Sequence, residues 1–392
     1  MAPTTHPLFS PAELSYLHTS LSLTPPIRPD GRAPAQFRPL IAETDILPSA
    51  NGSARICFAD GTEAIAGVKA EVEKSSSVGG LGSEEADEEK DERHLGTGGG
   101  EVEDGDDDEG GDDDEGGSSA ARRASKGRGR DEWVEMTVEI PGFRDDDALP
   151  VFMAAMISEA LLADGHLRDR LWINRRYHWK FYIDILLLSP PTSYPLPLLS
   201  LTTHLALLST RLPSLKSELD EDPLFNDDWA ASEPLYPHPE SQSTSKAKGP
   251  SRSMRARPPI TLLVMTVGNN IIFDPSKEEL AVADFVQAVS VAESASSQHL
   301  RLLSLRTIDP PSRHTNPGVP NTLNPATGGG PATASVAEML AAREGMDAEG
   351  VWRAPRGGVK RGVVGRIVGM VCKAGGVGEE VLDGLRGVDV AV

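Results

Sequence analysis

Arg28-Pro29-Asp30-Gly31-Arg32 is the stretch of this 392-residue chain that carries the most information about its fold. A Phe-Arg-Pro triplet follows at residues 37–39, and Asn-Gly-Ser-Ala-Arg follows at residues 51–55. Taken alone, the first stretch predicts a turn between two arginines, because Pro, Asp and Gly are favoured in turns. The segments that come after it, and their order, give it a more specific meaning.

The residues around this stretch predict one helix and a set of strands. Leu14, Leu17 and Leu21 share one face of a helix over residues 12–21, and Pro11 stands at its start. An Asp-Gly pair between two apolar runs is a strong hairpin signal. We therefore predict strands at residues 40–47, 54–58 and 64–72, with the hairpin turn at residues 60–61.

A second set of patterns begins near residue 131. The run 177–188 is almost wholly apolar at its end, which predicts an interior strand. Further strands are expected at 133–140, 171–173, 260–267, 271–273, 280–291 and 300–307, and helices at 149–162, 196–208, 336–342 and 359–371. This order predicts an α+β fold built from two related halves.

The net charge of −21 belongs mainly to one segment. Residues 84–115 hold eighteen acidic and two basic side chains, and the rest of the chain carries only about −5. Residues 74–131 are dominated by Ser, Gly, Asp and Glu, a composition that cannot bury enough apolar surface to offset its ordering entropy. We expect a disordered insert there, acidic first and basic at residues 122–130.

Composition also divides the chain into parts. The predicted N-terminal half covers residues 1–73 and 131–215, and a disordered insert at 74–130 interrupts it. A polar Pro-rich linker at 216–258 leads to the predicted C-terminal half at 259–308 and 335–392. A disordered Pro- and Gly-rich linker at 309–334 interrupts that second half.

Two further observations concern compartment and chemistry. Cys57 and Cys372 lie far apart in apolar contexts, so buried, reduced thiols are favoured over a disulfide or a metal site. No apolar run approaches the roughly 18 residues needed to span a bilayer, and no secretory signal is visible. We therefore predict a protein of the nucleus or cytoplasm that has no membrane partner.

Four blocks of the chain, in order, resemble the RNase PH family. The first consists of the three segments at residues 27–55, and the most specific is Phe-Asp-Pro-Ser-Lys-Glu-Glu-Leu at residues 273–280. The other two are Tyr-Ile-Asp-Ile-Leu-Leu-Leu at 182–188 and the paired segments 258–261 and 267–270. The likeness covers residues 12–73, 131–210 and 223–308, and its pattern is that of the inactive ring subunits of the eukaryotic RNA exosome.

The resemblance implies a fold, an assembly and a location. The fold would be two βαβ halves of the ribosomal protein S5 domain 2-like type. The assembly would be a six-membered ring of RNase PH-like subunits with cap proteins and an associated nuclease, around a channel that threads single-stranded RNA. The ring would act in 3′-to-5′ RNA processing and decay, including rRNA maturation, in the nucleus with its nucleolus and in the cytoplasm.

Active members of the family cleave RNA with inorganic phosphate, and the resemblance implies where that phosphate would bind. They carry Asp-Gly-Gly-Thr-Arg directly after the central strand, where backbone N–H groups, a hydroxyl and an arginine hold the anion. Prolines have no N–H to donate, and no arginine follows until Arg211. The corresponding residues here, which we predict to form a degenerate phosphate loop, are Ser189, Pro190, Pro191, Thr192 and Ser193.

A second part of the expected catalytic site is also missing from the sequence. The family places a general acid or metal-binding carboxylate on the segment that leads into the strand at 260–267, and residues 253–259 contain no acid. We therefore predict no catalytic residue, no metal site and no cofactor. Two alternatives remain open: a phosphorolytic exoribonuclease acting through a composite interface site, and an acidic chaperone-like interaction protein.

Several charged residues are candidates for contacts with RNA or with other subunits. The acidic run is expected to be a solvated spacer or a binder of basic partners, on the outer face of the ring. The basic run 122–130 is expected either to contact RNA phosphates or to neutralise the acidic run. Asp184 is expected to be a buried structural residue, and the acids at 220–222 and 227–228 to be solvated. The candidate RNA or interface contacts are Arg28, Arg32, Arg55, Arg175 and Arg176; for the last two, a turn into a strand with buried aromatic neighbours is the favoured interpretation.

Overall fold

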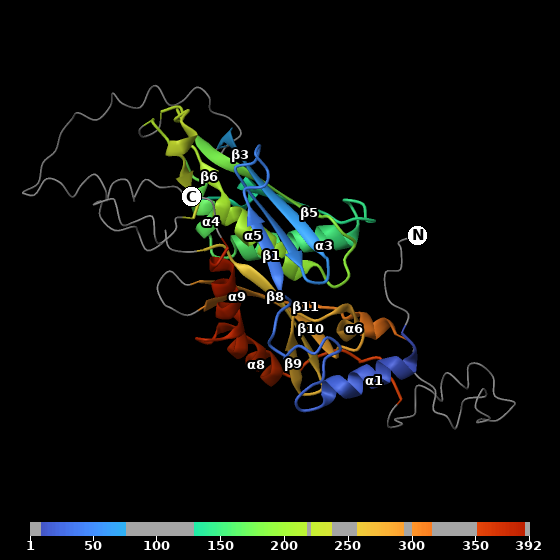
Figure 1. The fold of residues 1–392 in the computed structure, drawn as a ribbon. Helices are drawn as coiled ribbons and strands as arrows, with labels where there is room; N and C mark the ends of the chain where they lie inside the picture. The colour runs from blue at the N-terminus through green and yellow to red at the C-terminus, as the bar shows by residue number, and fades with distance from the viewer. Residues whose placement is uncertain are drawn as a thin grey trace, which may run out of the picture.

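The computed structural model describes residues 9–75, 129–217, 221–236, 257–293, 300–315 and 351–388. These ranges form two main sheets with helices between and outside them (Figure 1). The acidic run, most of the basic run and the helix predicted at 336–342 lie outside the described residues.

The first sheet has five strands in the order β1-β2-β3-β5-β4. All neighbours are antiparallel except β4 and β5, which run parallel. A parallel pair needs a crossover, and α3 (Ala148–Leu162) with α4 (His166–Arg170) supplies it, so β4-α3-β5 is a βαβ unit. The strands are β1 (Leu40–Thr44), β2 (Gly52–Phe58), β3 (Glu63–Lys74), β4 (Val134–Glu139) and β5 (Tyr177–Leu187).

The second sheet has four antiparallel strands in the order β11-β10-β8-β9. The strands are β8 (Ile260–Val267), β9 (Asn270–Phe273), β10 (Phe285–Glu293) and β11 (Leu300–Ile308). All eight residues of β8 are buried, so this strand is the core of the second half. In this half, the one-turn helix α6 (Lys277–Leu280) links β9 to β10, and these two strands flank β8.

Helix α5 (Leu196–Ser209) joins the two halves, because it packs against β2 and β3 of the first sheet and β8 of the second (Figure 1). Every one of its residues is buried. Its polar residues tolerate burial because they are hydrogen-bonded: the hydroxyls of Thr202 and Thr203 each donate to a carbonyl four residues earlier at 2.8 Å. The hydrophobic core is therefore continuous through the centre of the molecule.

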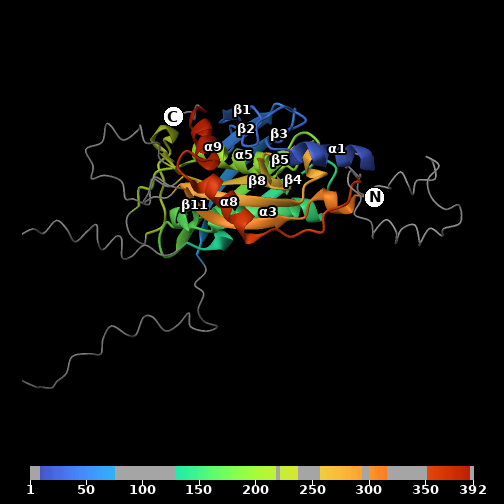
Figure 2. The same cartoon turned by 90° about the horizontal axis from the view of Figure 1, so that it is seen from below.

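The remaining elements lie on the outside. Helix α1 (Pro11–Ser22) begins with a capping box in which Ser10 and Glu13 satisfy each other's backbone N–H groups. Helices α8 (Arg361–Cys372) and α9 (Val377–Arg386) pack together, and α8 also contacts β11 (Figure 2). Two short strands, β6 (Arg211–Leu212) and β7 (Glu233–Pro234), form a small separate ladder.

The α+β class and most of the predicted elements are confirmed. The strand predicted at 171–173 is wrong: this segment follows α4, and only Trp172 bridges to β5. The strand predicted from residue 280 begins at Phe285, because residues 280–284 complete α6 and a turn. Helices α4 and α9 were not predicted.

Two segments predicted to be linkers contain ordered structure. Residues 221–236 include β7, and Leu235 and Tyr236 are buried. Residues 309–315 lie in the predicted disordered linker, yet they form a 3-10 turn with buried Ser312. Both segments are held by a few buried side chains, which composition alone does not reveal.

Cys57 and Cys372 are free thiols, but the expectation that both are buried is wrong, because each is partly exposed. In the parts of the chain that the structure covers, every helix is too short or too polar to cross a bilayer.

Candidate functional site

A buried ion pair anchors the Arg-Pro-Asp-Gly-Arg stretch to the second half of the chain. Nε and Nη2 of Arg28 donate to the two carboxylate oxygens of Glu279 at 2.7 and 2.8 Å, and neither side chain has exposed surface. Glu279 is held in place by a capping box with Ser276 at the start of α6. Arg28 also donates to the carbonyls of Phe273 and Asp274. This bidentate geometry is what a buried pair needs to offset its desolvation.

Asp274 is the second anchor, and two arginines share it. Its carboxylate accepts from Nη1 of Arg32 at 2.8 Å and from Nη2 of Arg38 at 2.7 Å, and it also accepts the Arg38 backbone N–H at 2.9 Å. Asp274 has a φ of 47°, in the left-handed region that Asp tolerates better than most residues. The block at 273–280 and the block at 28–38 are therefore two sides of one contact.

Arg38 extends this contact to the hairpin turn between β2 and β3. Its Nη1 contacts the Asp60 carboxylate and donates to the Ser193 hydroxyl at 2.7 Å. Burial acts to lower the pKa of Arg38, but hydrogen bonding to Asp274 and the charges of Asp274 and Asp60 outweigh it and raise that pKa. Arg38 is thus a fully charged guanidinium whose charge is balanced by two carboxylates of the same chain.

The loop at residues 189–193, the predicted position of the phosphate site, is tied down by its own hydroxyls. The Thr192 hydroxyl donates to Asp60 at 2.9 Å, and the Ser189 hydroxyl accepts the Glu63 N–H at 3.1 Å. With Ser193 bonded to Arg38, all three hydroxyls of the loop have partners within the chain. Burial acts to raise the pKa of Asp60, but hydrogen bonds from Thr62, the Arg38 charge and Thr192 outweigh it, so that pKa is lowered.

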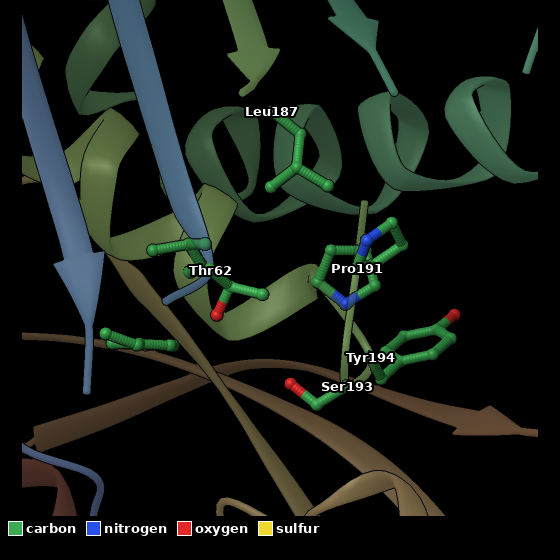
Figure 3. Close-up of a pocket in the computed structure, with 8 residues that line it drawn as sticks. Thr62, Leu187, Pro191, Ser193 and Tyr194 are labelled. Carbon is green, nitrogen blue, oxygen red and sulfur yellow. The ribbon is translucent and has the colours of Figure 1, made fainter. Parts of the chain in front are cut away.

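Behind the loop lies an apolar hollow, shown in Figure 3. The Pro191 ring and the Tyr194 side chain line it, with Leu187 from the end of β5 and Thr62 from the start of β3. The hollow has no room for a water molecule. Burial raises the pKa of the Tyr194 phenol, so the phenol stays neutral. An anion in this hollow would lose its hydration against a mainly apolar lining, which carries a large desolvation cost.

The N-terminus of α5, which follows this loop, offers few donors to an anion. Pro195 is its N-cap residue and Pro197 stands in its first turn, so neither position presents an N–H. No side chain caps this end, and Leu196 and Leu198 are buried. Helix N-termini bind anions through several exposed N–H groups, and this one is buried and has fewer of these donors.

The structure excludes one candidate RNA contact and shows that a second is paired within the chain. Arg28 has no exposed side-chain surface and is bonded within the chain, so it cannot contact RNA or a neighbouring subunit. Arg32 is almost as deeply buried and is paired with Asp274 and Asp30. Sequence reasoning missed Arg38 as a site residue, although the Phe-Arg-Pro triplet of the resemblance contained the signal.

Of the other three candidates, Arg175 and Arg176 are exposed and Arg55 is partly exposed. Arg55 is 42% exposed and pairs with Glu43 and Glu63 on the outer face of the first sheet. Arg175 and Arg176 lie in the turn before β5, and Arg176 pairs with Asp222. As favoured from the sequence, this turn leads into a strand with buried rings: His178 stacks on Trp133 with centroids 4.3 Å apart, and Trp179 contacts Phe225. Their roles with RNA or partners stay predictions.

The remaining acidic candidates show no catalytic arrangement. Asp184 was expected to be buried, but it is exposed on β5 and accepts a hydrogen bond from Thr137. Asp222 accepts from the Tyr177 hydroxyl at 3.1 Å, and Asp228 caps a 3-10 turn. Among the described residues, no three His, Cys, Asp or Glu side chains are grouped as a metal site would require.

The geometry therefore defines a two-sheet α+β protein in which the hydroxyls of the loop at residues 189–193 are bonded within the chain, and comparison with known proteins shows what it resembles. No protein-family model matches the sequence. Two curated yeast proteins are similar to it over most of their length, and both are components of the exosome complex. The predicted resemblance to ring subunits of the exosome is confirmed by these relatives.

The particular relatives carry one name. Exosome complex component RRP42 of Saccharomyces cerevisiae is 28% identical over 302 residues, which cover 76% of this chain and 86% of the relative. Exosome complex component rrp42 of Schizosaccharomyces pombe is 29% identical over 296 residues, covering 74% and 81%. The chain is thus similar to the RRP42 proteins over about three quarters of its length.

Solved structures give a more distant likeness. An archaeal exosome core is 16% identical with a TM-score of 0.44 and covers 76% of this chain and 84% of its own. The Archaeoglobus fulgidus exosome with RNA bound to the active site is 17% identical with a TM-score of 0.45, over 76% and 87%.

Proposed function

We propose that this chain is a non-catalytic structural subunit of the RNA exosome ring that supports 3′-to-5′ RNA processing and decay, including rRNA maturation. The similarity to the RRP42 proteins supports membership of the complex. In this role the chain holds neighbouring RNase PH-like subunits, and an associated nuclease performs the cleavage. The ring would also contact cap proteins, and part of its RNA channel would be lined by this chain.

The observation that carries the non-catalytic assignment is the state of the loop at residues 189–193. Its hydroxyls are bonded to Asp60, Arg38 and the β3 backbone. Its two prolines present no N–H. The nearby guanidinium of Arg38 is balanced by Asp274 and Asp60. A phosphate dianion would meet no free positive charge from Arg38 and no free hydroxyl, so we propose that this phosphate loop is degenerate.

A phosphorolysis assay tests this assignment. The purified full-length chain is incubated with a single-stranded RNA and inorganic phosphate, and released nucleoside diphosphates are measured against an active RNase PH as the positive control. We expect no release above background. Release by the chain alone would overturn the assignment, and release only after a partner subunit is added would establish the composite-site alternative instead.

A copurification experiment tests membership of the ring. Tagged chain is isolated from its own cells, and copurifying proteins are identified by mass spectrometry. We expect five other RNase PH-like chains, together with cap proteins and a nuclease, in both nuclear and cytoplasmic extracts. A matched variant lacking residues 84–115 should recover the same set. Loss of all partners in that variant would favour the acidic chaperone-like alternative.

A further inference from the structure

Within the ranges that the structure describes, residues 351–376 form a strongly basic segment whose exposed cations have no acid partner there. Residues 351–376 contain six Arg or Lys residues and no acid, although the whole chain has a net charge of −21. The segment enters along residues 351–360, where Trp352 packs against His18 of α1, and continues through α8. Five of its cations are exposed, and we call them the basic face: Arg356, Lys360, Arg361, Arg366 and Lys373.

The basic face is not neutralised by carboxylates. In the described ranges, no salt bridge joins any of its five residues to an acid, and Arg366 makes a single hydrogen bond to the Asn269 carbonyl at 3.3 Å. Several other arginines at the surface of these ranges are paired: Arg306 with Glu159, Arg313 with Asp309, and Arg386 with Glu293 and Asp383. Like charges that cluster without partners repel one another, so the folded state gains nothing from this arrangement.

The position of two cations on α8 adds to that cost. Lys360 is the N-cap residue and Arg361 is the first residue of the helix, whose first turn contains no acid. A helix N-terminus carries partial positive charge, so cations there are destabilising and acids are normally preferred. Exposed cations that cost stability and have no acid partner among the described residues are suited to binding a negatively charged partner.

The surface between the cations is open to close approach. Gly362, Gly365 and Gly369 lie on the exposed side of α8, and a Cβ added at any of them would meet no atom within 4 Å. With 3.6 residues per turn, Gly362 and Gly369 fall on the same side of the helix as Arg366 and Lys373. A chain of phosphates can therefore lie against the α8 backbone with cations beside it.

The chemistry of this surface favours nucleic acid over protein as the partner. Protein interfaces rely on buried aromatic or apolar anchors at their centre, and the exposed side of α8 offers only Met370, at 36% exposure. Phosphate backbones need only cations and open access, and they bind by counterion release. From the basic face we infer a binding surface for the phosphate backbone of single-stranded RNA. The proposed exosome function contributes only the choice of RNA as the polyanion.

A titration with RNA tests the inference. The full-length chain is titrated onto a fluorescently labelled oligouridylate of about twelve nucleotides, and anisotropy is recorded at several salt concentrations. The test variant carries Arg361→Gln, Arg366→Gln and Lys373→Gln. Each lost phosphate contact on a single strand lowers the slope of log K against log salt by about 0.7. We expect the slope to fall by about two and the affinity at low salt to fall at least tenfold.

The matched control removes the same charge from exposed positions elsewhere, with Lys69→Gln, Arg144→Gln and Lys216→Gln. It should bind RNA as the unmodified chain does. An equal loss in the control, or no loss in the test variant, would overturn the inference. A labelled poly-aspartate peptide of equal charge is titrated in parallel. If it binds as tightly as RNA through the same three residues, the surface is a site for acidic protein and the RNA assignment is wrong.

A single substitution separates binding from folding. Gly369→Glu places a carboxylate among the cations, in open space, and Glu is a better helix former than Gly by roughly 0.5 kcal/mol. We expect the variant to be at least as stable as the parent and to bind RNA several-fold more weakly. Unchanged affinity would count against the inference. The readout needs no ring, so a failure here is distinct from failure of the copurification that tests the proposed function.

Discussion

The arginines of the N-terminal stretch and those of the basic face have the same side chain but opposite environments. Arg28, Arg32 and Arg38 are buried, and each is paired with a carboxylate from a distant part of the chain. The cations of the basic face are exposed and have no carboxylate partner in the described ranges. The comparison teaches that paired arginines hold the two halves together, whereas unpaired ones mark a surface where something else binds.

The largest effect on stability is expected when the acid partner of the most deeply buried arginine is removed. Glu279→Ala leaves the Arg28 guanidinium buried without its countercharge, which typically costs about 3–5 kcal/mol. We expect the free energy of unfolding, measured by denaturant titration, to fall by that amount. The double variant Arg28→Met with Glu279→Leu removes both charges and should recover much of the loss. If the single variant is as stable as the parent, the pair is not a structural anchor.

His204 of α5 tests the cost of a buried charge that has no acid partner in the described ranges, in contrast to the paired charge of Arg28. Burial lowers the pKa of this fully buried histidine to about 4, from an unfolded value near 6.5. Between these values the unfolded state binds a proton that the folded state does not, so stability falls as pH drops below about 6.5. The loss should approach about 3 kcal/mol near pH 4. Unfolding measured from pH 7 to pH 4 checks this, and His204→Phe should flatten that part of the profile.

Asp274→Asn sharpens the role of the second anchor. Asn keeps an oxygen acceptor and tolerates the left-handed backbone, but it removes the charge shared by Arg32 and Arg38. A loss of about 2 kcal/mol is expected for hydrogen bonds to charged groups. Asp274→Ala should cost at least one kcal/mol more, since Ala at this φ is strained. Equal stabilities of the two variants would show that the backbone conformation contributes little.

The smallest expected effect lies on the basic face. Gly365→Ala adds a methyl group in open space on α8 and should raise stability by roughly 0.5–1 kcal/mol, because Ala is the better helix former. Thermal unfolding gives the change. The matched substitution Gly378→Ala, where the added Cβ would meet backbone and side-chain atoms of Val371 and Leu300, should instead destabilise. Destabilisation by Gly365→Ala would mean that the exposed side of α8 is packed.

Local sequence patterns predicted most helices and strands correctly, but they did not predict which distant side chains contact one another. The Asp-Gly pair at 60–61 gave the hairpin of β2 and β3, and the apolar run at 177–188 gave an interior strand, because both signals are contained in a few neighbouring residues. The apolar residues at 280–283 resembled the start of a strand, but a capping box at Ser276 made them part of a helical turn.

The candidate site was predicted in part for the same reason. The prolines at 190 and 191 are local, and they gave the loss of backbone donors directly. The pairing of Arg28 with Glu279 joins residues 251 positions apart, and no periodicity encodes such a contact. Arg28 and Arg32 therefore resembled surface residues in sequence, and only the fold showed that their partners come from the second half.

The separation between Arg28 and Glu279 has a consequence for synthesis of the protein. Ribosomes add about 5–20 residues per second, so Glu279, which lies 251 positions after Arg28, appears on the order of tens of seconds later. Throughout that interval the N-terminal arginines have no buried carboxylates to meet, and α5 has only one of the two sheets that cover it. The first half of a nascent chain can therefore complete its buried ion pairs only after the second half emerges.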